Sequence, residues 1–208
     1  MDLVLVSSVI NTSNKPLSYT PTRSVYSVQQ RYEQTLDTIK SLEKIENKKI
    51  LFVELSDIPE YENEIISKVD FYKNIYKENK DIVDGLHKGV GEALSILEGI
   101  KDIDLTLYDN IYKISGRYWL TDKFNYSLWN NNDTMLYEDK KHNSIVTVLY
   151  KINKNQYKEW ISTLTNICYT SNPKAIEWIF KEHMKNYTPI NPVGVSGYFS
   201  IDGKYFEI

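Results

Sequence analysis

The sequence is poor in several residue types that define whole classes of protein. Its 208 residues include one cysteine, Cys168, which excludes a disulfide framework and a cysteine-based zinc site. A single thiol is typical of a reducing compartment, so we expect a cytoplasmic protein. The three histidines lie far apart and lack the paired spacing of zinc ligands. No apolar run approaches the ~18 residues that cross a bilayer, so we expect no transmembrane segment.

Net charge and glycine patterns exclude further classes. The net charge of −3 and pI of 5.7 differ from those of nucleic-acid-binding domains, which usually carry a basic excess, so we expect no nucleic-acid partner. The eight glycines form neither G-x-x-x-x-G-K-[ST] nor G-x-G-x-x-G, so the sequence supports neither a P-loop nor a dinucleotide fold. It also lacks a G-x-S-x-G nucleophile elbow. Any active site must therefore use less common patterns.

Apolar runs that predict strands alternate with periodic stretches that predict helices. The expected strands are 2–11, 48–57, 110–115, 144–152 and 193–201, and the expected helices are 25–42 with Ser24 as N-cap, 59–69, 88–100, 155–169 and 173–184. A DG pair at 202–203 predicts a closing turn. This order predicts an α/β protein with a mostly parallel sheet flanked by helices. Because no Pro/Gly/Ser-rich linker divides the chain, we expect one domain over 1–208, which can be part of a longer protein.

Polar residues follow the predicted strands, and two short segments there combine glycine with basic residues. Ligands of open α/β sheets bind at the carboxyl ends of the strands, so this edge is the expected site. Arginine is rare in this lysine-rich chain, yet Arg117 follows Gly116 in "KISGRYWL". A guanidinium is a rigid fork suited to phosphate, although an ion pair with Asp109 or Asp122 would also explain it.

The second basic segment is "KGVGE", residues 88–92. Gly89 and Gly91 would let the backbone approach a ligand closely, and peptide N–H groups at the start of the helix could face a phosphate. Lys88 would add positive charge. The alternative is a loop that merely requires positive φ before a helix begins.

The acidic segments are ambiguous. "DID", with Asp102 and Asp104, has the D-x-D pattern that holds divalent cations such as Mn²⁺ or Mg²⁺ through oxygen ligands. It precedes the strand at 110–115 instead of ending it, which argues against a metal site. "YED" at 137–139 is interpreted as a solvated turn.

Taken together, the strand ending "SSVIN", the strand "ILFVELSD", "KGVGEALSIL", "YDNIYKISGRYWL" and "VGVSGYFSIDG" resemble one family. They are similar to the small GT-A-like glycosyltransferases of large DNA viruses and bacterial surface-glycan clusters. Those proteins carry a K-G-x-G-E element, followed about twenty residues later by K-[IT]-[ST]-G-R-Y. The resemblance covers most of the chain, from about residue 2 to 203. It implies a GT-A-like fold and, for a viral member, the host cytoplasm.

The resemblance implies a nucleoside-diphosphate sugar as donor, a glycan as acceptor, and hexosyl or deoxyhexosyl transfer. The expected donor-binding residues are Ser8, Asn11 and Asp57 for the nucleoside, Lys88, Gly89 and Gly91 for phosphate or sugar, Glu92 for sugar hydroxyls, and Lys113, Gly116 and Arg117 for the diphosphate. Asp122, Glu138 and Asp139 are the catalytic candidates, because an inverting transferase needs a carboxylate to take the acceptor's proton. No D-x-D ends a strand, so either another acid holds a metal or Lys and Arg neutralise the diphosphate.

Two other functions remain open at this point. A nucleotidyltransferase that makes nucleotide sugars would need a glycine-rich basic loop after the first strand, and "SSVINTSNKP" contains no glycine. A non-catalytic nucleotide- or sugar-binding module would share the same ligand edge.

Overall fold

The computed structural model describes residues 1–169 and 174–208. A central seven-stranded sheet has the order β3-β2-β1-β4-β7-β6-β8. Its strands are β1 (Asp2–Ser8), β2 (Lys48–Glu54), β3 (Phe71–Asn74), β4 (Asn110–Ser115), β6 (Met135–Asp139), β7 (Ser144–Asn153) and β8 (Thr188–Pro189). The first four strands in that order run parallel, and β7 pairs antiparallel with β4 and β6. The expected α/β fold with a mostly parallel sheet is therefore confirmed.

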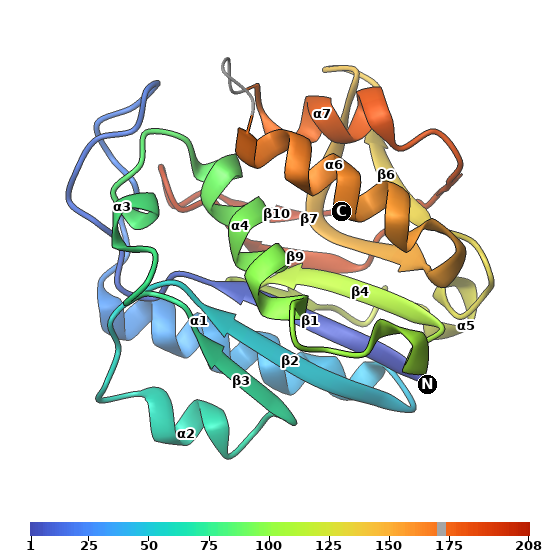
Figure 1. Ribbon diagram of the computed structural model, residues 1–208, viewed down its shortest axis with the longest axis horizontal. Helices are drawn as coiled ribbons and strands as arrows, with labels where there is room; N and C mark the ends of the chain where they lie inside the picture. Colours follow the sequence, from blue (N-terminus) through green and yellow to red (C-terminus); the bar gives the residue numbers. More distant parts are fainter. Residues whose placement is uncertain (170–173) are drawn as a thin grey trace.

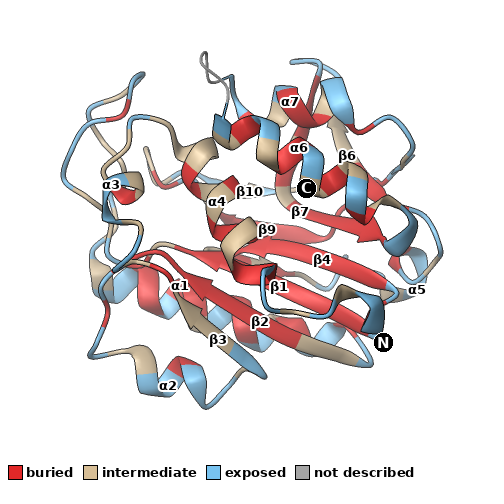
Figure 2. Ribbon diagram, viewed as in Figure 1, coloured by how far each residue is buried: buried red, intermediate tan, exposed pale blue. Residues whose placement is uncertain are grey.

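Helices cover both faces of this sheet, with α4, α6 and α7 above and α1 and α2 below in the view of Figure 1. The helices are α1 (Val28–Ser41), α2 (Glu62–Ile66), α3 (Lys80–Val83), α4 (Lys88–Ile100), α5 (Tyr126–Trp129), α6 (Tyr157–Tyr169) and α7 (Ile176–His183), with 3₁₀ turns at Leu42–Lys44, Leu105–Leu107 and Lys154–Gln156. Strand β1 is buried along its whole length, so its alternate side chains serve two cores (Figure 2). Leu3 and Leu5 belong to the core of α4, α6 and α7, whereas Val4 and Val6 belong to the core of α1.

A second, smaller sheet has the order β10-β9-β5. Its strands are β5 (Tyr118–Leu120), β9 (Val195–Tyr198) and β10 (Tyr205–Glu207). The expected turn at 202–203 is confirmed: it joins β9 and β10 as an antiparallel pair, and Gly203 has the positive φ of 71° that glycine tolerates. This sheet contacts α1 through β5, so the C-terminal residues lie beside the N-terminal half of the chain.

Several local predictions were wrong for identifiable reasons. The N-cap of α1 is Ser27, because Gln30 completes a capping box with it, whereas Ser24 bonds within its own turn to Tyr26. Strands β3 and β6 were not expected, because the mixed polarity of their segments does not predict a strand. They are extended because they pair with β2 and β7. Residues 137–139 therefore end a strand instead of forming a turn. The helix expected from 173 begins at Ile176, and residue 173 lies outside the described residues.

None of the helices in the described residues is both long and apolar enough to cross a membrane.

Candidate functional site

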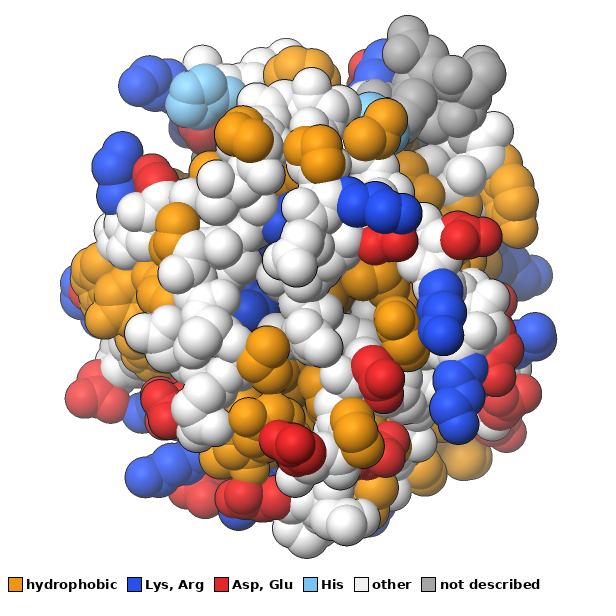
Figure 3. Space-filling view, turned by 90° about the vertical axis from the view of Figure 1, so that its left-hand side faces the viewer, with side chains coloured by type: hydrophobic (Ala, Val, Ile, Leu, Met, Phe, Trp, Pro, Cys, Tyr) orange, Lys and Arg blue, Asp and Glu red, His pale blue; other side chains and the backbone are white. Residues whose placement is uncertain are grey.

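A hollow of about 120 Å³ opens at the carboxyl ends of β1 and β4, and we call it the first hollow. Ser7 and Ser8 of β1, Ser115 of β4 and the first turns of α4 line it. Figure 3 looks onto this edge of the sheet, where Lys and Arg surface is visible in a recess near the middle. The structure therefore places polar strand ends, a helix start and basic groups around one opening, as expected for the ligand edge of an open α/β sheet.

All three arginines of the chain, Arg23, Arg31 and Arg117, line the first hollow. Among the described residues, no carboxylate forms an ion pair with any of them: Asp109 pairs with the N-terminus and Lys154, and Asp122 pairs with Lys44. The alternative that Arg117 serves a surface ion pair is therefore wrong. Three guanidinium groups gathered without a carboxylate partner give this hollow a strong preference for anions.

The three guanidinium groups differ in how far the protein already uses them. Arg31 is buried, and its Nε donates to the Val9 carbonyl at 2.8 Å, which fixes the turn after β1. Burial and the neighbouring Arg117 lower the pKa of Arg31 to about 9, so it stays charged at neutral pH. Arg23 donates to the Lys15 carbonyl at 2.6 Å and to the Asp84 carbonyl at 3.0 Å.

Arg117 has the most unused donor capacity of the three. Its Nη2 donates to the Tyr118 hydroxyl at 2.8 Å, and its guanidinium lies 4.9 Å from the centre of the Tyr118 ring. Its Nε is buried without a hydrogen-bond partner among the described residues. An orphaned buried donor costs free energy, so a ligand oxygen that accepts from Arg117 would be stabilised.

Lys88 adds a fourth basic group at the first turn of α4. Its Nζ donates to the Ser200 Oγ at 2.7 Å and to the Arg23 carbonyl at 3.0 Å, which leaves one of its three donors. Burial, followed by the charges of Arg117, Arg31 and Arg23, lowers the pKa of Lys88 to about 7. An anion beside these groups would restore the charged form of Lys88.

The start of α4 contributes backbone donors as well. His87 is its N-cap residue and makes no side-chain capping bond. The first N–H groups of this 13-residue helix are therefore not used by a side-chain cap, and the positive end of the helix dipole lies at the hollow. The helix expected over 88–100 is confirmed, so the "KGVGE" segment is its first turn and not the loop given as the alternative. Gly91 lines the first hollow, whereas a Cβ at Gly89 would lie 3.3 Å from the Cβ of Ile176, so Gly89 lets α4 approach α7.

A second hollow, of about 350 Å³, adjoins the first. The two hollows share five lining residues: His87, Lys88, Glu92, Ser115 and Arg117. The second hollow is also bounded by Thr147 of β7 and Glu177 of α7. Together the two are of the size that small-molecule sites usually have, ~300–1,000 Å³. To the shared residues the first hollow adds Arg23 and Arg31, whereas the second adds Lys174 and Glu177, so the first is the more basic end.

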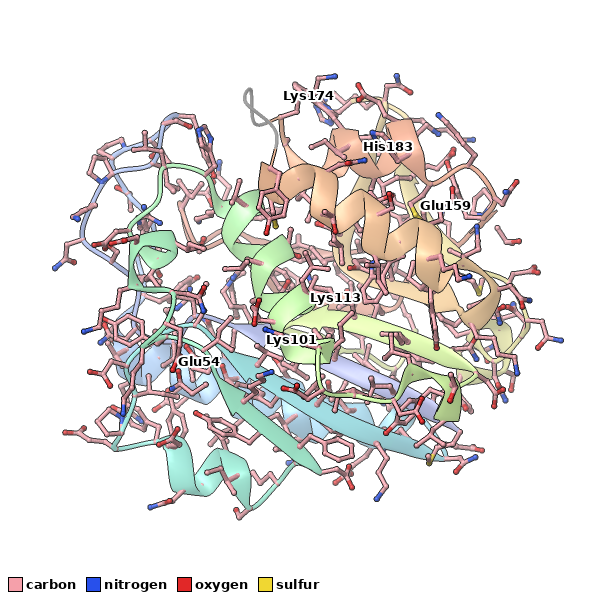
Figure 4. The ribbon with its side chains drawn as sticks, viewed as in Figure 1. Glu54, Lys101, Lys113, Glu159, Lys174 and His183 are labelled. Atoms are coloured by element: carbon pink, nitrogen blue, oxygen red, sulfur yellow. The ribbon has the colours of Figure 1, made fainter. Side chains whose placement is uncertain are left out.

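Lys113 lies beneath this space and does not line it. Figure 4 shows Lys113 between the sheet and the helices that cover it. Its ammonium is fully buried and donates to a Glu92 carboxylate oxygen, to Ser115 Oγ at 2.8 Å and to the Thr147 carbonyl at 3.1 Å. All three of its donors are therefore used within the protein. Burial lowers the pKa of Lys113, and the Glu92 carboxylate opposes that shift.

Glu177, in the first turn of α7, is a carboxylate that the sequence analysis did not select. It lines the second hollow and forms no ion pair with a cation of the described residues. Burial and the negative charge of Glu92 raise the pKa of Glu177. A carboxylate with a raised pKa in a cleft has the properties of a proton-transfer group.

The other expected donor-binding residues lie at the same edge but not all within the hollows. Ser8 lines the first hollow. Asn11 and Asp57 lie side by side on the loops after β1 and β2, where Asn11 Nδ2 donates to the Asp57 carbonyl at 3.2 Å. Gly116 packs against β1, since a Cβ there would come within 3.1 Å of the Cβ of Ser8. Gly116 thus permits the close approach that brings Arg117 to the opening.

The three expected catalytic acids lie outside both hollows, and each bonds to a cation or histidine elsewhere. Asp122 is fully exposed and pairs with Lys44, beyond the C-terminal end of α1 and away from the carboxyl ends of the strands. Glu138 bonds to Lys181 at 2.6 Å and to Tyr187, and Asp139 caps its own hairpin through His142. These contacts satisfy the carboxylates locally, and none of the three reaches the shared space.

The D-x-D pair is also placed away from the site. Asp102 pairs with Lys73 at 2.7 Å, and Asp104 caps a 3₁₀ turn by accepting from Thr106 N–H at 3.0 Å. Both follow the end of α4 and precede β4, which is the opposite edge of the sheet. In residues 1–169 and 174–208, no cluster of three or more His, Cys, Asp or Glu side chains could hold a metal ion.

One signal in the sequence could have found two residues that were missed. Arg23 and Arg31 share with Arg117 the rarity of arginine in a lysine-rich chain, and that rarity alone singles out three residues that meet in space. Glu177 carries no comparable signal, because one acid in the first turn of a helix is common.

No known family model matches the sequence, and no curated protein matches it. Solved structures resemble the fold at low sequence identity. A nucleotide-diphospho-sugar transferase described as putative, from Desulfovibrio desulfuricans G20, has 8% identity and a TM-score of 0.52 over 91% of this chain and 79% of that chain. The glycosyltransferase GlyE of Streptococcus pneumoniae TIGR4 has 11% identity and a TM-score of 0.50 over 91% of this chain and 44% of that chain. A glycosyltransferase involved in the glycosylation of the major capsid of PBCV-1 has 9% identity and a TM-score of 0.49 over 91% and 81% of the two chains. The chain thus has the GT-A-like fold of nucleotide-diphospho-sugar transferases.

Proposed function

We propose that this protein is a glycosyltransferase that moves a hexosyl or deoxyhexosyl group from a nucleoside-diphosphate sugar to a glycan acceptor. The observation that carries the proposal is the gathering of Arg23, Arg31, Arg117 and Lys88 around one hollow at the carboxyl edge of the sheet. A diphosphate carries enough negative charge to balance several such groups. The fold supports the class of donor, and the basic hollow supports the position of its diphosphate.

The first hollow then binds the diphosphate, and the second binds the sugar. Arg117 and Lys88 lie at the boundary between the two hollows, so they would contact the bond between phosphate and sugar. Ser8, Asn11 and Asp57 remain the proposed nucleoside contacts at the strand ends. Glu92, held by the buried Lys113, would accept hydrogen bonds from sugar hydroxyls. Lys113 thereby positions Glu92 and does not contact the diphosphate.

The described residues of the two hollows do not fit a divalent cation. Hard cations such as Mn²⁺ and Mg²⁺ need several oxygen ligands, but Glu92 is already bonded to Lys113 and the adjoining groups are basic. Fixed guanidinium groups instead stabilise the negative charge that develops on the departing nucleoside diphosphate. We therefore propose transfer without a metal ion.

Glu177 replaces the acids first selected as the acceptor of the proton. The acceptor's hydroxyl oxygen forms a bond to the anomeric carbon, and the bond between that carbon and the diphosphate oxygen breaks. The electron pair of the broken bond leaves with the nucleoside diphosphate, and the hydroxyl proton passes to the carboxylate of Glu177. Burial raises the pKa of Glu177, which makes its carboxylate a stronger base for this step.

A thermal-shift panel of nucleoside diphosphates, with and without Mn²⁺ or Mg²⁺, tests the donor site first. We expect at least one nucleotide to stabilise the protein without added metal. The matching nucleotide sugars are then assayed for release of nucleoside diphosphate. Glu177→Gln should abolish release while leaving nucleotide binding intact, and Glu159→Gln on α6 is the matched control (Figure 4).

The outcomes separate the alternatives. Stabilisation by no nucleotide would overturn the proposal. Formation of pyrophosphate from a nucleoside triphosphate and a sugar phosphate would instead identify a nucleotidyltransferase. Nucleotide binding without turnover of any nucleotide sugar would leave a binding module.

A further inference from the structure

A row of aromatic side chains lies on one face of the small sheet, outside both hollows. Tyr198 is at its centre, with ring centres 5.7 Å from Trp119, 6.1 Å from Tyr26 and 5.5 Å from Tyr205. Trp119, Tyr198 and Tyr205 come from three neighbouring strands, and Tyr205 is 55% exposed. The other face of the small sheet already joins the core through Tyr118 and Leu120, so the four rings are not part of that core.

One end of this row continues into a groove of about 410 Å³. Trp119 is its aromatic wall, and the facing wall is the C-terminal end of α1 with the 3₁₀ turn after it. Asp37, Lys40 and Glu43 line that wall and form no ion pair within the described residues. The groove therefore combines one aromatic face with unpaired hydrogen-bonding groups of both signs.

The other end of the row reaches the first hollow. Tyr198 ends β9, and Ser200, two residues later, accepts from Lys88 Nζ at 2.7 Å and lines that hollow. The Ser200 carbonyl also accepts from Val25 N–H at 2.8 Å, which places Tyr26 next to the same junction. The aromatic row thus forms a continuous path from the α1 groove to the basic site.

This combination favours one kind of occupant. The groove is lined by two acids, Asp37 and Glu43, and by two lysines, Lys40 and Lys44, so it has no excess of positive charge to select a nucleotide or another polyanion. A purely apolar partner would leave these charges without partners. A saccharide chain has hydroxyl groups for both signs of charge and apolar C–H faces for the rings, whose hydroxyl and indole groups can also bond.

We propose that Trp119, Tyr198, Tyr205 and the α1 groove bind a neutral oligosaccharide, several sugar units long, as the acceptor. The role as acceptor rests on the proposed glycosyltransferase function. The oligosaccharide lies along the α1 groove and over the aromatic row, and its terminal sugar reaches the junction of the two hollows. An acceptor of one sugar unit would occupy only the junction, without the aromatic row, and bind weakly.

Binding can be measured without knowing the natural acceptor. Wild type, Trp119→Ala and Tyr205→Ala are titrated calorimetrically with neutral tetrasaccharides of glucose, galactose, mannose or N-acetylglucosamine. Trp178→Ala is the matched control, because Trp178 is 50% exposed on α7, outside the row. For at least one tetrasaccharide we expect wild type and Trp178→Ala to bind equally, and each row variant to bind about five- to tenfold more weakly, as for loss of one aromatic contact.

Nucleoside-diphosphate binding, measured by thermal shift, should be the same in all four proteins, which shows that each is folded. If Trp119→Ala fails this check, Tyr205→Ala carries the test. The inference is overturned if no tetrasaccharide binds wild type, or if both folded row variants bind as wild type does. Saccharide binding that depends on the row, together with failure of every nucleotide sugar to turn over, would retain the groove and remove the glycosyltransferase function. Turnover with unchanged acceptor KM in the row variants would retain the glycosyltransferase function and remove the groove as its acceptor site.

Discussion

Raising the pH should release a nucleoside diphosphate from the first hollow, because Lys88 loses its proton. Burial and the neighbouring arginines lower the pKa of Lys88 in the unliganded protein to about 7. A bound diphosphate favours the charged form and raises this pKa toward the ordinary lysine value of about 10.4. Below the lower pKa, Lys88 is charged before and after binding, so affinity does not depend on its titration. Above it, binding must take up a proton, so affinity falls as pH rises.

The size of the effect follows from the fraction of protein in which Lys88 is charged. With a pKa of about 7 this fraction falls from about one half at pH ~7 to about one tenth at pH ~8, so the apparent Kd should rise about fivefold. Arg31, with a pKa of about 9, stays largely charged over this interval. The nucleotide itself contributes little over this interval, because a terminal phosphate titrates near pH ~6.

Isothermal titration calorimetry with the best-binding nucleoside diphosphate measures the Kd at each pH. Repeating the titration in buffers of different ionisation enthalpy reports the proton taken up on binding. Lys88→Arg is the control, because its guanidinium stays charged and should remove the dependence on pH. An equal slope in wild type and Lys88→Arg, or no proton uptake in wild type, would refute the reasoning.

Three further predictions follow from the same geometry. Arg117→Lys should weaken nucleoside-diphosphate binding about tenfold in the same calorimetric assay, because an ammonium cannot reproduce a planar fork, and unchanged affinity would remove Arg117 from the site. Lys113→Met should lower the free energy of unfolding by about 3–5 kcal/mol in urea, because Glu92 loses its buried partner. Adding Glu92→Gln should recover part of that loss, and no recovery would mean that the pair is not coupled. EDTA should leave donor turnover unchanged, because the proposal has arginines stabilise the charge of the departing diphosphate. Loss of turnover on adding EDTA would contradict transfer without a metal ion.

Much of the fold was predictable because its causes are local. The apolar runs of β1 and β2 are long enough to bury both faces, and the polar residues that end them are readable one by one. The antiparallel direction of β7 was not predictable, because an apolar run has no direction until a neighbour pairs with it. The capping box at Ser27 was readable, since Gln30 stands three residues later.

For the candidate site, the sequence predicted the sheet edge and three residues that line the hollow there, Lys88, Glu92 and Arg117; their roles stay predictions. The site was not predictable for the catalytic acids. Asp122 and Glu138 looked equally available in the sequence, but each is satisfied by a lysine that is distant along the chain. Glu177 reaches the second hollow only because α7 packs beside α4, where Gly89 removes the side chain that would hold the two helices apart.

The sequence by itself determined the α/β class, the polar ends of the strands and the scarcity of arginine, because periodicity and composition depend on neighbours along the chain. Only the tertiary structure decided what these residues do. It brings Arg23, Arg31 and Arg117 to one opening, turns Lys113 inward onto Glu92, and joins the C-terminal aromatic residues to α1. Most of these groups are distant along the chain, and their electrostatic coupling depends on distance in space.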